Sequence, residues 1–157
     1  VGYMERERRD LVRVDYVEQT RSPLSAADGE ALGYAEYFAE LIDEWAQEAD
    51  PSESLFRLGS SMVEAMASGV PIEPLARYFE FWLLRLQGVY EAADRMSPDA
   101  RACLAAARTS SPFALGNVVV SQRALREIEA VHRALISRHL EKDLRSVRVL
   151  SEIRRTP

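Results

Sequence analysis

The sequence has little of the side-chain chemistry on which most enzyme and metal sites depend. Its 157 residues include one cysteine, Cys103, and two histidines, His132 and His139. A single cysteine excludes an internal disulfide and any metal site built from several cysteines. The histidines are seven residues apart on one predicted helix, without an HExxH or ExxH pattern beside them. Gly-rich phosphate loops and nucleophile elbows are also missing. We therefore expect no metal, no cofactor and no enzymatic activity.

Long hydrophobic runs are missing as well. No stretch of 18 uncharged apolar residues occurs, so we expect no membrane span. The first ten residues, VGYMERERRD, are charged from the fifth position and contain no apolar segment of a signal peptide. Because the chain does not begin with methionine, we expect it to be the C-terminal part of a longer protein. One buried cysteine fits a reducing, cytoplasmic setting.

Charge is distributed unevenly along the chain. The net formal charge is −5, but residues 23–100 carry 15 acidic and 4 basic residues, whereas residues 121–157 carry 5 acidic and 9 basic residues. The middle of the chain would repel a phosphate backbone, and the C-terminal helices could approach one. The alternative is that both are solvated faces whose opposite charges partly satisfy each other.

The pattern predicts one strand followed by helices. Residues 11–17, LVRVDYV, are rich in β-branched residues and predict a strand, which requires partners in a sheet. Two acidic helices follow; Ser25 with Asp28 predicts the start of the first, and Asp50 with Pro51 predicts the start of the second. Their apolar residues recur with the helical period. These predicted inward positions are Ala31, Tyr34, Ala35, Phe38, Leu41, Ile42 and Trp45, then Leu55, Leu58, Met62 and Met66.

Residues 75–90, LARYFEFWLLRLQGVY, predict the central helix of the domain. Apolar side chains point all round its axis, which is typical of a helix buried on every side. Its charges are Arg77, Glu80 and Arg85. One interpretation pairs Arg77 with Glu80 at the edge of the core. The other places Arg77 at the rim of an apolar groove that binds an acidic, aromatic-ended peptide.

Two further helices and a short last one complete the predicted fold. Ser97 and Ser121 predict two N-caps, and the loop between those helices has Phe113 and Leu115 as apolar anchors. The last helix has Leu144, Val147, Leu150 and Ile153 as its inward residues. We therefore predict a mainly α protein, a compact bundle of about six helices preceded by one strand.

The order of these segments resembles the C-terminal helical region of RecO, a family of bacterial recombination mediators and DNA-annealing proteins. Four stretches carry the resemblance: LGYAEYFAELIDEW, SLFRLGSSMVEAMASG, LARYFEFWLLRLQGVY and HLEKDLRSVRVLSEIRR. The resemblance, taken as the order of these stretches, extends over residues 24–154. The resemblance implies that residues 1–20 are the last strand and linker of an N-terminal OB barrel, and that residues 21–157 are the helical domain. The four-cysteine zinc insertion of many relatives is missing after GVYEAADRM.

The resemblance implies a non-enzymatic role in recombinational repair, in a bacterial cytoplasm at the nucleoid. Expected partners are the acidic C-terminal tail of single-strand-binding protein (SSB), RecR, and single-stranded DNA bound mostly through the OB domain, with support of RecA loading and strand annealing. Arg77 of RYFE matches the arginine of the family's SSB-tail site. Arg85 and Arg57 are weaker candidates from charge alone.

Two alternatives remain from the sequence. The basic C-terminal helices predict an auxiliary DNA face, or a merely solvated surface. The residues concerned are Arg133, Arg138, Lys142, Arg145 and Arg148. The alternative function is the ligand-binding or dimerisation domain of a transcription regulator, whose apolar central helix would line a small-molecule pocket.

Overall fold

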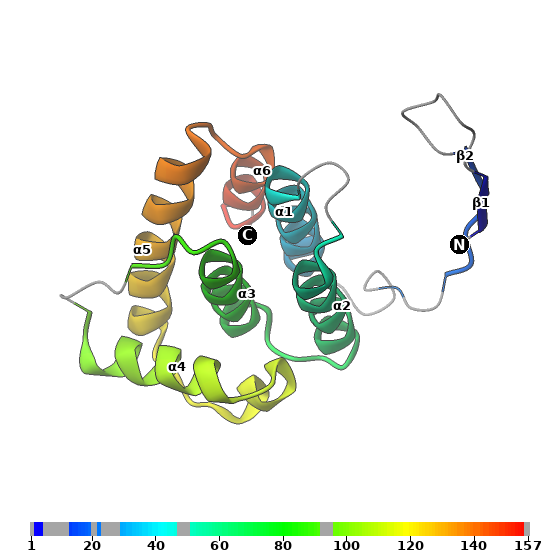
Figure 1. Ribbon diagram of the computed structural model, residues 1–157. Coiled ribbons are helices and arrows are strands. Elements are labelled where there is room, and N and C mark those ends of the chain that lie inside the picture. Colours follow the sequence, from blue (N-terminus) through cyan, green and yellow to red (C-terminus); the bar gives the residue numbers. More distant parts are fainter. Residues whose placement is uncertain are drawn as a thin grey trace.

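Six α-helices and one 3₁₀ helix build the body of the protein within the residues that the structure describes (Figure 1). The computed structural model describes residues 2–4, 13–19, 22, 29–46, 51–91 and 96–155. The helices are α1 (Gly29–Trp45), α2 (Glu53–Ala67), α3 (Ile72–Leu86), α4 (Pro98–Thr109), η2 (Pro112–Asn117), α5 (Gln122–Leu140) and α6 (Arg145–Ile153). The predicted mainly α fold, a compact helical bundle, is confirmed.

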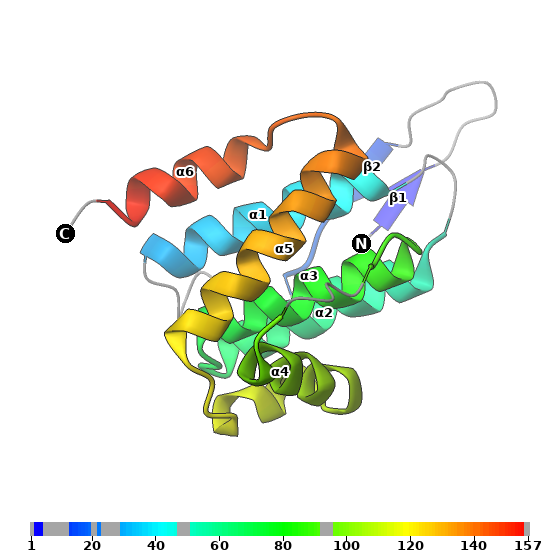
Figure 2. The same cartoon turned by 90° about the vertical axis from the view of Figure 1, so that its left-hand side faces the viewer.

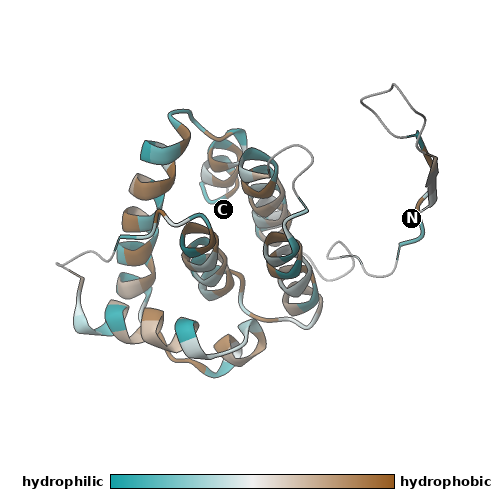
Figure 3. Cartoon of the chain, in the orientation of Figure 1, coloured by the Kyte–Doolittle hydropathy of each residue, from teal (hydrophilic) through white to brown (hydrophobic). Residues whose placement is uncertain are grey.

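Helix α3 is the central element, as the all-round apolar pattern predicts. It packs against α1, α2, α4, α5 and η2, which surround it in Figure 1. Its buried residues include Leu75, Phe79 and Leu84, and also the charged Arg77 and Glu80. Figure 3 shows that the apolar faces of the surrounding helices turn toward this centre. No described helix combines the length and the apolarity needed to cross a membrane.

Helices α1 and α6 pack closely although they lie at opposite ends of the domain sequence. Figure 2 shows them side by side. The contact is close at Gly33, where an added Cβ atom would lie 2.8 Å from the side chain of Leu150 and 3.0 Å from that of Ile153. The missing side chain of Gly33 therefore lets the last helix close over the first one.

The N-terminal strand prediction is incomplete. Residues Arg13–Tyr16 form β2, within the predicted strand, but it pairs antiparallel with a second strand, β1 (Gly2–Met4). Strand β1 is only three residues long, too short for a sequence pattern to predict it. All four residues of β2 are exposed, so this strand is not part of the helical core. Residues 11 and 12 lie outside the described residues.

Some of the predicted helix starts are confirmed, and one is wrong. Ser97 and Ser121 cap α4 and α5 as predicted, since their hydroxyl oxygens accept hydrogen bonds from the backbone N–H groups of Ala100 and Ala124 at 3.3 and 3.2 Å. The predicted starts at Ser25, Asp28 and Asp50 lie outside the described residues. Helix α2 begins at Glu53 with Ser52 as its N-cap, so the prediction that Asp50 is the N-cap and Pro51 the first helical residue was wrong.

The predicted loop after α4 also requires a correction. Residues Pro112–Asn117 form the short helix η2. Leu115 is buried as predicted, but Phe113 is 43% exposed and does not anchor the segment. Pro112 is buried instead.

The packing of α3 leads to a stability prediction with a matched control. Phe79 is fully buried and stacks on Phe38 with ring centroids 4.4 Å apart, whereas Phe56 on α2 is 74% exposed. We expect Phe79→Ala to lower the free energy of unfolding by about 3–5 kcal/mol, because the substitution removes a ring that is buried from water and leaves a cavity in its place. Phe56→Ala should change it by no more than about 0.5 kcal/mol. Urea unfolding of the three proteins measures the difference, and equal losses would contradict this core assignment.

Candidate functional site

A groove of about 620 Å³ lies between α1, α5 and α6. This volume is within the range of protein pockets that bind ligands or peptide side chains. The lining residues come from α1, from the second half of α5, from the α5–α6 connection and from α6. They are Tyr37, Arg133, Ile136, Ser137, Lys142, Asp143, Leu144, Arg145, Val147, Arg148 and Ser151.

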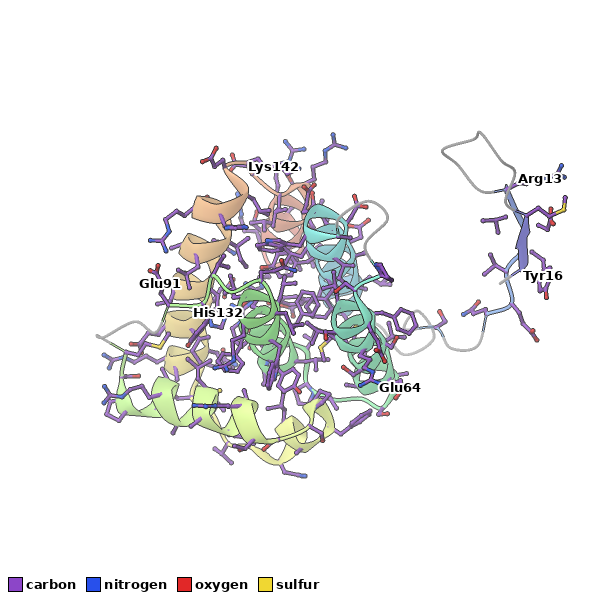
Figure 4. All side chains as sticks on the ribbon, in the orientation of Figure 1. Arg13, Tyr16, Glu64, Glu91, His132 and Lys142 are labelled. Carbon is purple, nitrogen blue, oxygen red and sulfur yellow. The ribbon has the colours of Figure 1, made fainter. Side chains whose placement is uncertain are left out.

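The groove combines an apolar lining with a basic rim. Tyr37, Ile136, Leu144 and Val147 supply the apolar part, and the rim has four basic side chains against one acidic side chain. Figure 4 shows Lys142 at the turn that joins α5 to α6. Such a surface suits a ligand that has both negative charge and an apolar group.

Two of the four basic residues at the rim have acidic partners. Arg133 pairs with Glu129 at 3.0 Å, and Lys142 pairs with Glu44 of α1. Among the described residues, Arg145 and Arg148 form no side-chain ion pair, and both are exposed. These two guanidinium groups are therefore the ones most available to an incoming anion.

Helix α6 is fixed over the groove at its first turn. The carboxylate of Glu40 on α1 accepts hydrogen bonds from the backbone N–H groups of Arg145 and Ser146, both at 2.9 Å, and from the Ser146 hydroxyl. Burial opposes ionisation of Glu40, but these hydrogen bonds outweigh it and lower the pKa of the carboxyl. An acidic residue of α1 thus caps the N-terminus of α6, where unpaired N–H groups favour negative charge.

Arg154 fixes the other end of α6. Its guanidinium contacts Glu30 at 3.0 Å and Glu129 at 3.1 Å, donates a hydrogen bond to the Tyr34 hydroxyl, and lies over the Tyr34 ring at 5.3 Å. Burial would lower the pKa of Arg154, but the neighbouring anionic groups raise it. Both ends of α6 are therefore tied to α1, and the groove has fixed walls.

A buried ionic network lies beneath the groove. Glu80, which is 2% exposed, accepts a hydrogen bond from the Tyr37 hydroxyl at 3.0 Å and forms an ion pair with Arg77 at 2.9 Å, both on Oε1. Its Oε2 atom lies 3.0 Å from Nδ1 of His132. Arg77 also reaches Glu129 at 3.2 Å. The network joins α1, α3 and α5 through one carboxylate.

The two histidines have structural surroundings rather than a shared site. Figure 4 shows His132 between α5 and α3. Because an ionised carboxylate only accepts hydrogen bonds, His132 donates from Nδ1 to Glu80, and its buried Nε2 has no partner among the described residues. His139 stacks on Trp45 instead, with centroids 5.6 Å apart. Within the described residues, no group of three or more His, Cys, Asp or Glu side chains could hold a metal ion.

The network favours the ionised forms of Glu80 and Arg77. Burial alone would raise the pKa of Glu80, but Arg77 and the hydrogen bonds from His132 and Tyr37 lower it below its usual range. Burial would lower the pKa of Arg77, but Glu80 and Glu129 raise it. Burial raises the pKa of Tyr37 well above its usual value, so its phenol stays protonated and donates to Glu80.

The structure separates the three arginines predicted for the SSB-tail site. Arg77 is 4% exposed and forms the predicted i,i+3 pair with Glu80. Arg85, at the other end of α3, is exposed, with its guanidinium 5.6 and 5.8 Å from the ring centroids of Phe81 and Trp82. Arg57 is exposed on α2 and pairs with Glu53 at 2.6 Å. None of the three lines the groove.

The residues predicted for an auxiliary DNA face lie closer together. Arg133, Lys142, Arg145 and Arg148 all line the groove. Arg138 does not, and it pairs with Glu91 at 2.9 Å. The charge pattern of the sequence thus pointed to four residues that line the groove, but it did not predict the groove itself.

Sequence reasoning missed the roles of Tyr37 and His132. Their partner Glu80 is 43 and 52 residues away in sequence, so local spacing could not join them. A signal was nevertheless present: Glu80 is a lone carboxylate inside an apolar helix, and a buried charge requires partners. His132 falls on the apolar stripe of α5 between Ile128 and Leu135, all three of which are buried.

The lowered pKa of Glu80 leads to a pH prediction. Because the pKa of Glu80 is lower in the folded state than in the unfolded chain, its ionisation contributes stability that is complete above the ordinary value of about 4.3. That contribution is lost as the pH falls through the folded-state pKa. We expect acid to destabilise the wild type more steeply than Glu80→Gln, which should be about 3 kcal/mol less stable at pH 7. Urea unfolding from pH 7 to pH 3 measures both; parallel curves would contradict this assignment.

Comparison with known proteins shows similarity to one family over part of this chain. Residues 26–95 match the family model described as Recombination protein O C terminal. This match covers α1, α2 and α3, which carry Tyr37, Arg77 and Glu80. No solved structure matches the chain.

Three curated relatives are DNA repair proteins named RecO. The protein from Koribacter versatilis is 35% identical over 92 residues, which are 56% of this chain and 36% of the relative. That from Geobacter metallireducens is 27% identical over 159 residues, or 80% of this chain and 64% of the relative. That from Pelotomaculum thermopropionicum is 34% identical over 96 residues, or 60% and 37%. The chain thus spans less than two thirds of each relative, and residues 26–95 are similar to the C-terminal region of RecO proteins.

Proposed function

We propose that this protein acts in DNA repair and homologous recombination, and that its helical domain binds the acidic C-terminal tail of SSB in the groove between α1, α5 and α6. The observation that carries the proposal is the combination of an apolar lining with four basic residues at one opening. The three RecO relatives, each named a DNA repair protein, support the broader role.

The groove has the two features that an acidic, phenylalanine-ended peptide requires. An aromatic side chain fits against Ile136, Leu144 and Val147, whose burial from water favours binding. Peptide carboxylates can pair with Arg145 and Arg148, which form no ion pair among the described residues. Guanidinium groups bind carboxylates through two parallel hydrogen bonds, and this geometry adds specificity.

We extend the proposal to the steps of recombinational repair that would follow tail binding. Tail binding would bring the protein to single-stranded DNA covered by SSB, where RecR is a second proposed partner in RecA loading and strand annealing. Arg85, held against two aromatic rings, and Arg57 remain proposed secondary contacts for the tail. The transcription-regulator alternative requires a ligand pocket along the central helix, whereas apolar residues of α3 pack into the described core.

A peptide titration tests the tail-binding proposal. A nine-residue acidic peptide that ends in phenylalanine should bind the wild type, and Arg148→Ala or Arg145→Ala should each weaken binding about tenfold by removing a charged hydrogen bond. Arg108→Ala, an exposed arginine on α4 outside the groove, is the matched control and should keep the wild-type Kd. Fluorescence anisotropy measures each Kd. Absence of binding, or equal effects at Arg148 and Arg108, would refute the proposal.

Single-stranded DNA is a second candidate ligand for the same basic rim, because four of the five residues proposed for an auxiliary DNA face lie there. If they contact phosphates, the logarithm of the binding constant should fall linearly with the logarithm of the salt concentration. Each of Arg145→Ala and Arg148→Ala should reduce this slope by about 0.7, and Arg138→Ala should do so if the face extends along α5. Binding to oligo-dT between 50 and 300 mM NaCl measures the slope. An unchanged slope in all three variants would exclude these residues as phosphate contacts.

A further inference from the structure

Tyr37 belongs both to the groove and to the buried network. Its ring lines the groove together with residues of α5 and α6, whereas its hydroxyl points into the core and donates to Glu80 at 3.0 Å. Tyr37 is otherwise buried. It is the one residue that lines the groove and also hydrogen-bonds to Glu80, among the residues that the structure describes. Its position therefore depends on groups that a ligand does not touch.

Arg77 is poorly placed for a direct contact with a peptide. It is 4% exposed, and its two terminal nitrogens pair with Glu80 at 2.9 Å and with Glu129 at 3.2 Å. The remaining guanidinium nitrogen, Nε, has no partner among the described residues but is itself buried. A peptide carboxylate could therefore reach Arg77 only by opening the core or by displacing one of its partners, and both are costly. The rim arginines offer the same chemistry without that cost.

The contacts of Glu80 provide an indirect route from Arg77 to the groove. Arg77 pairs with Oε1 of Glu80, and Tyr37 donates a hydrogen bond to the same oxygen, while His132 donates to the other one. The position of Oε1 is therefore set from α3 and α5, and the Tyr37 ring follows it because its hydroxyl is attached there. Hydrogen-bonded groups in such a network are energetically coupled.

We propose that Arg77 and Glu80 are positioning residues, which set the apolar lining of the groove by holding Tyr37, and that Arg77 does not contact the bound tail. This inference rests on the proposed binding of an acidic tail in the groove. It gives the arginine of the RYFE segment a role through Tyr37. The rim residues Arg145 and Arg148 then supply the charge that the tail meets.

The proposal predicts a specific pattern of peptide affinities. Tyr37→Phe keeps the ring but removes the hydroxyl, and should weaken binding of the acidic peptide about fivefold. The double variant Arg77→Met with Glu80→Met removes the ion pair as a unit, together with the oxygen that accepts from Tyr37, and it avoids leaving either charge alone. The double variant should weaken binding of the acidic peptide by the same factor as Tyr37→Phe. The triple variant should bind no more weakly than the double variant, because all these changes act through one hydrogen bond.

The salt dependence of peptide binding distinguishes a residue that positions the groove from one that contacts the peptide directly. Removing a charge that touches the peptide flattens the dependence of Kd on salt, as we expect for Arg148→Ala. The double variant at positions 77 and 80 should keep the wild-type salt dependence. A flattened dependence, or a loss in the triple variant equal to the product of the separate losses, would overturn the proposal. Tyr78→Phe removes a phenol of α3 that does not line the groove, and serves as the control.

Methyl NMR spectra of the free proteins test the inference even if the wild type binds no peptide. Thermal unfolding first confirms that each variant is folded. Tyr37→Phe and the double variant should then shift the same methyl signals, those of Ile136, Leu144 and Val147, whereas Tyr78→Phe should leave them unchanged. Unshifted groove methyls in the double variant would refute positioning. Shifted methyls without peptide binding would instead refute the proposed ligand and retain the positioning role.

Discussion

The charge of Glu80 is the constraint on which the arrangement of this domain depends. A carboxylate in the middle of a central helix costs several kcal/mol to bury unless it is paired and fully hydrogen-bonded. Here the partners come from three helices: Arg77 from α3 itself, Tyr37 from α1 and His132 from α5. Apolar packing alone would tolerate small rotations of these helices about their axes. The carboxylate does not, because each rotation would remove one of its three donors.

The same network links the core to the surface. Glu129 forms ion pairs with Arg77 in the core, with Arg133 at the groove rim and with Arg154 at the end of α6. It is only partly buried, so the ionic network becomes progressively more exposed from Glu80 toward the rim. Pairs at the exposed end contribute little to stability, whereas the Glu80 pair contributes through the large cost of breaking it. The rim can therefore exchange partners while the centre stays fixed.

How far the sequence could predict this structure depends on the distance between partners. The Arg77–Glu80 pair follows from local i,i+3 spacing, and the burial of α3 follows from apolar residues on every side of its axis. The contacts of Tyr37 and His132 with Glu80 bridge more than 40 residues, and no periodicity specifies them. The groove depends on the return of α6 onto α1 at Gly33, an even longer separation. Charge patterning identified its basic rim but could not show that an apolar lining lies between those residues.

The uneven charge of the chain helps to build the groove. Acidic residues of α1 hold the basic C-terminal helices, through Glu40 at the first turn of α6, Glu44 at Lys142 and Glu30 at Arg154. The opposite charges of the two halves thus satisfy each other in part, as one interpretation of the sequence expected. The compensation is incomplete at Arg145 and Arg148, which form no ion pair within the described residues. Glu40 accepts hydrogen bonds from the backbone at the start of α6, and its charge also attracts Arg145. It thus fixes the helix and leaves Arg148 as the positive side chain at the groove that is most available to an anion.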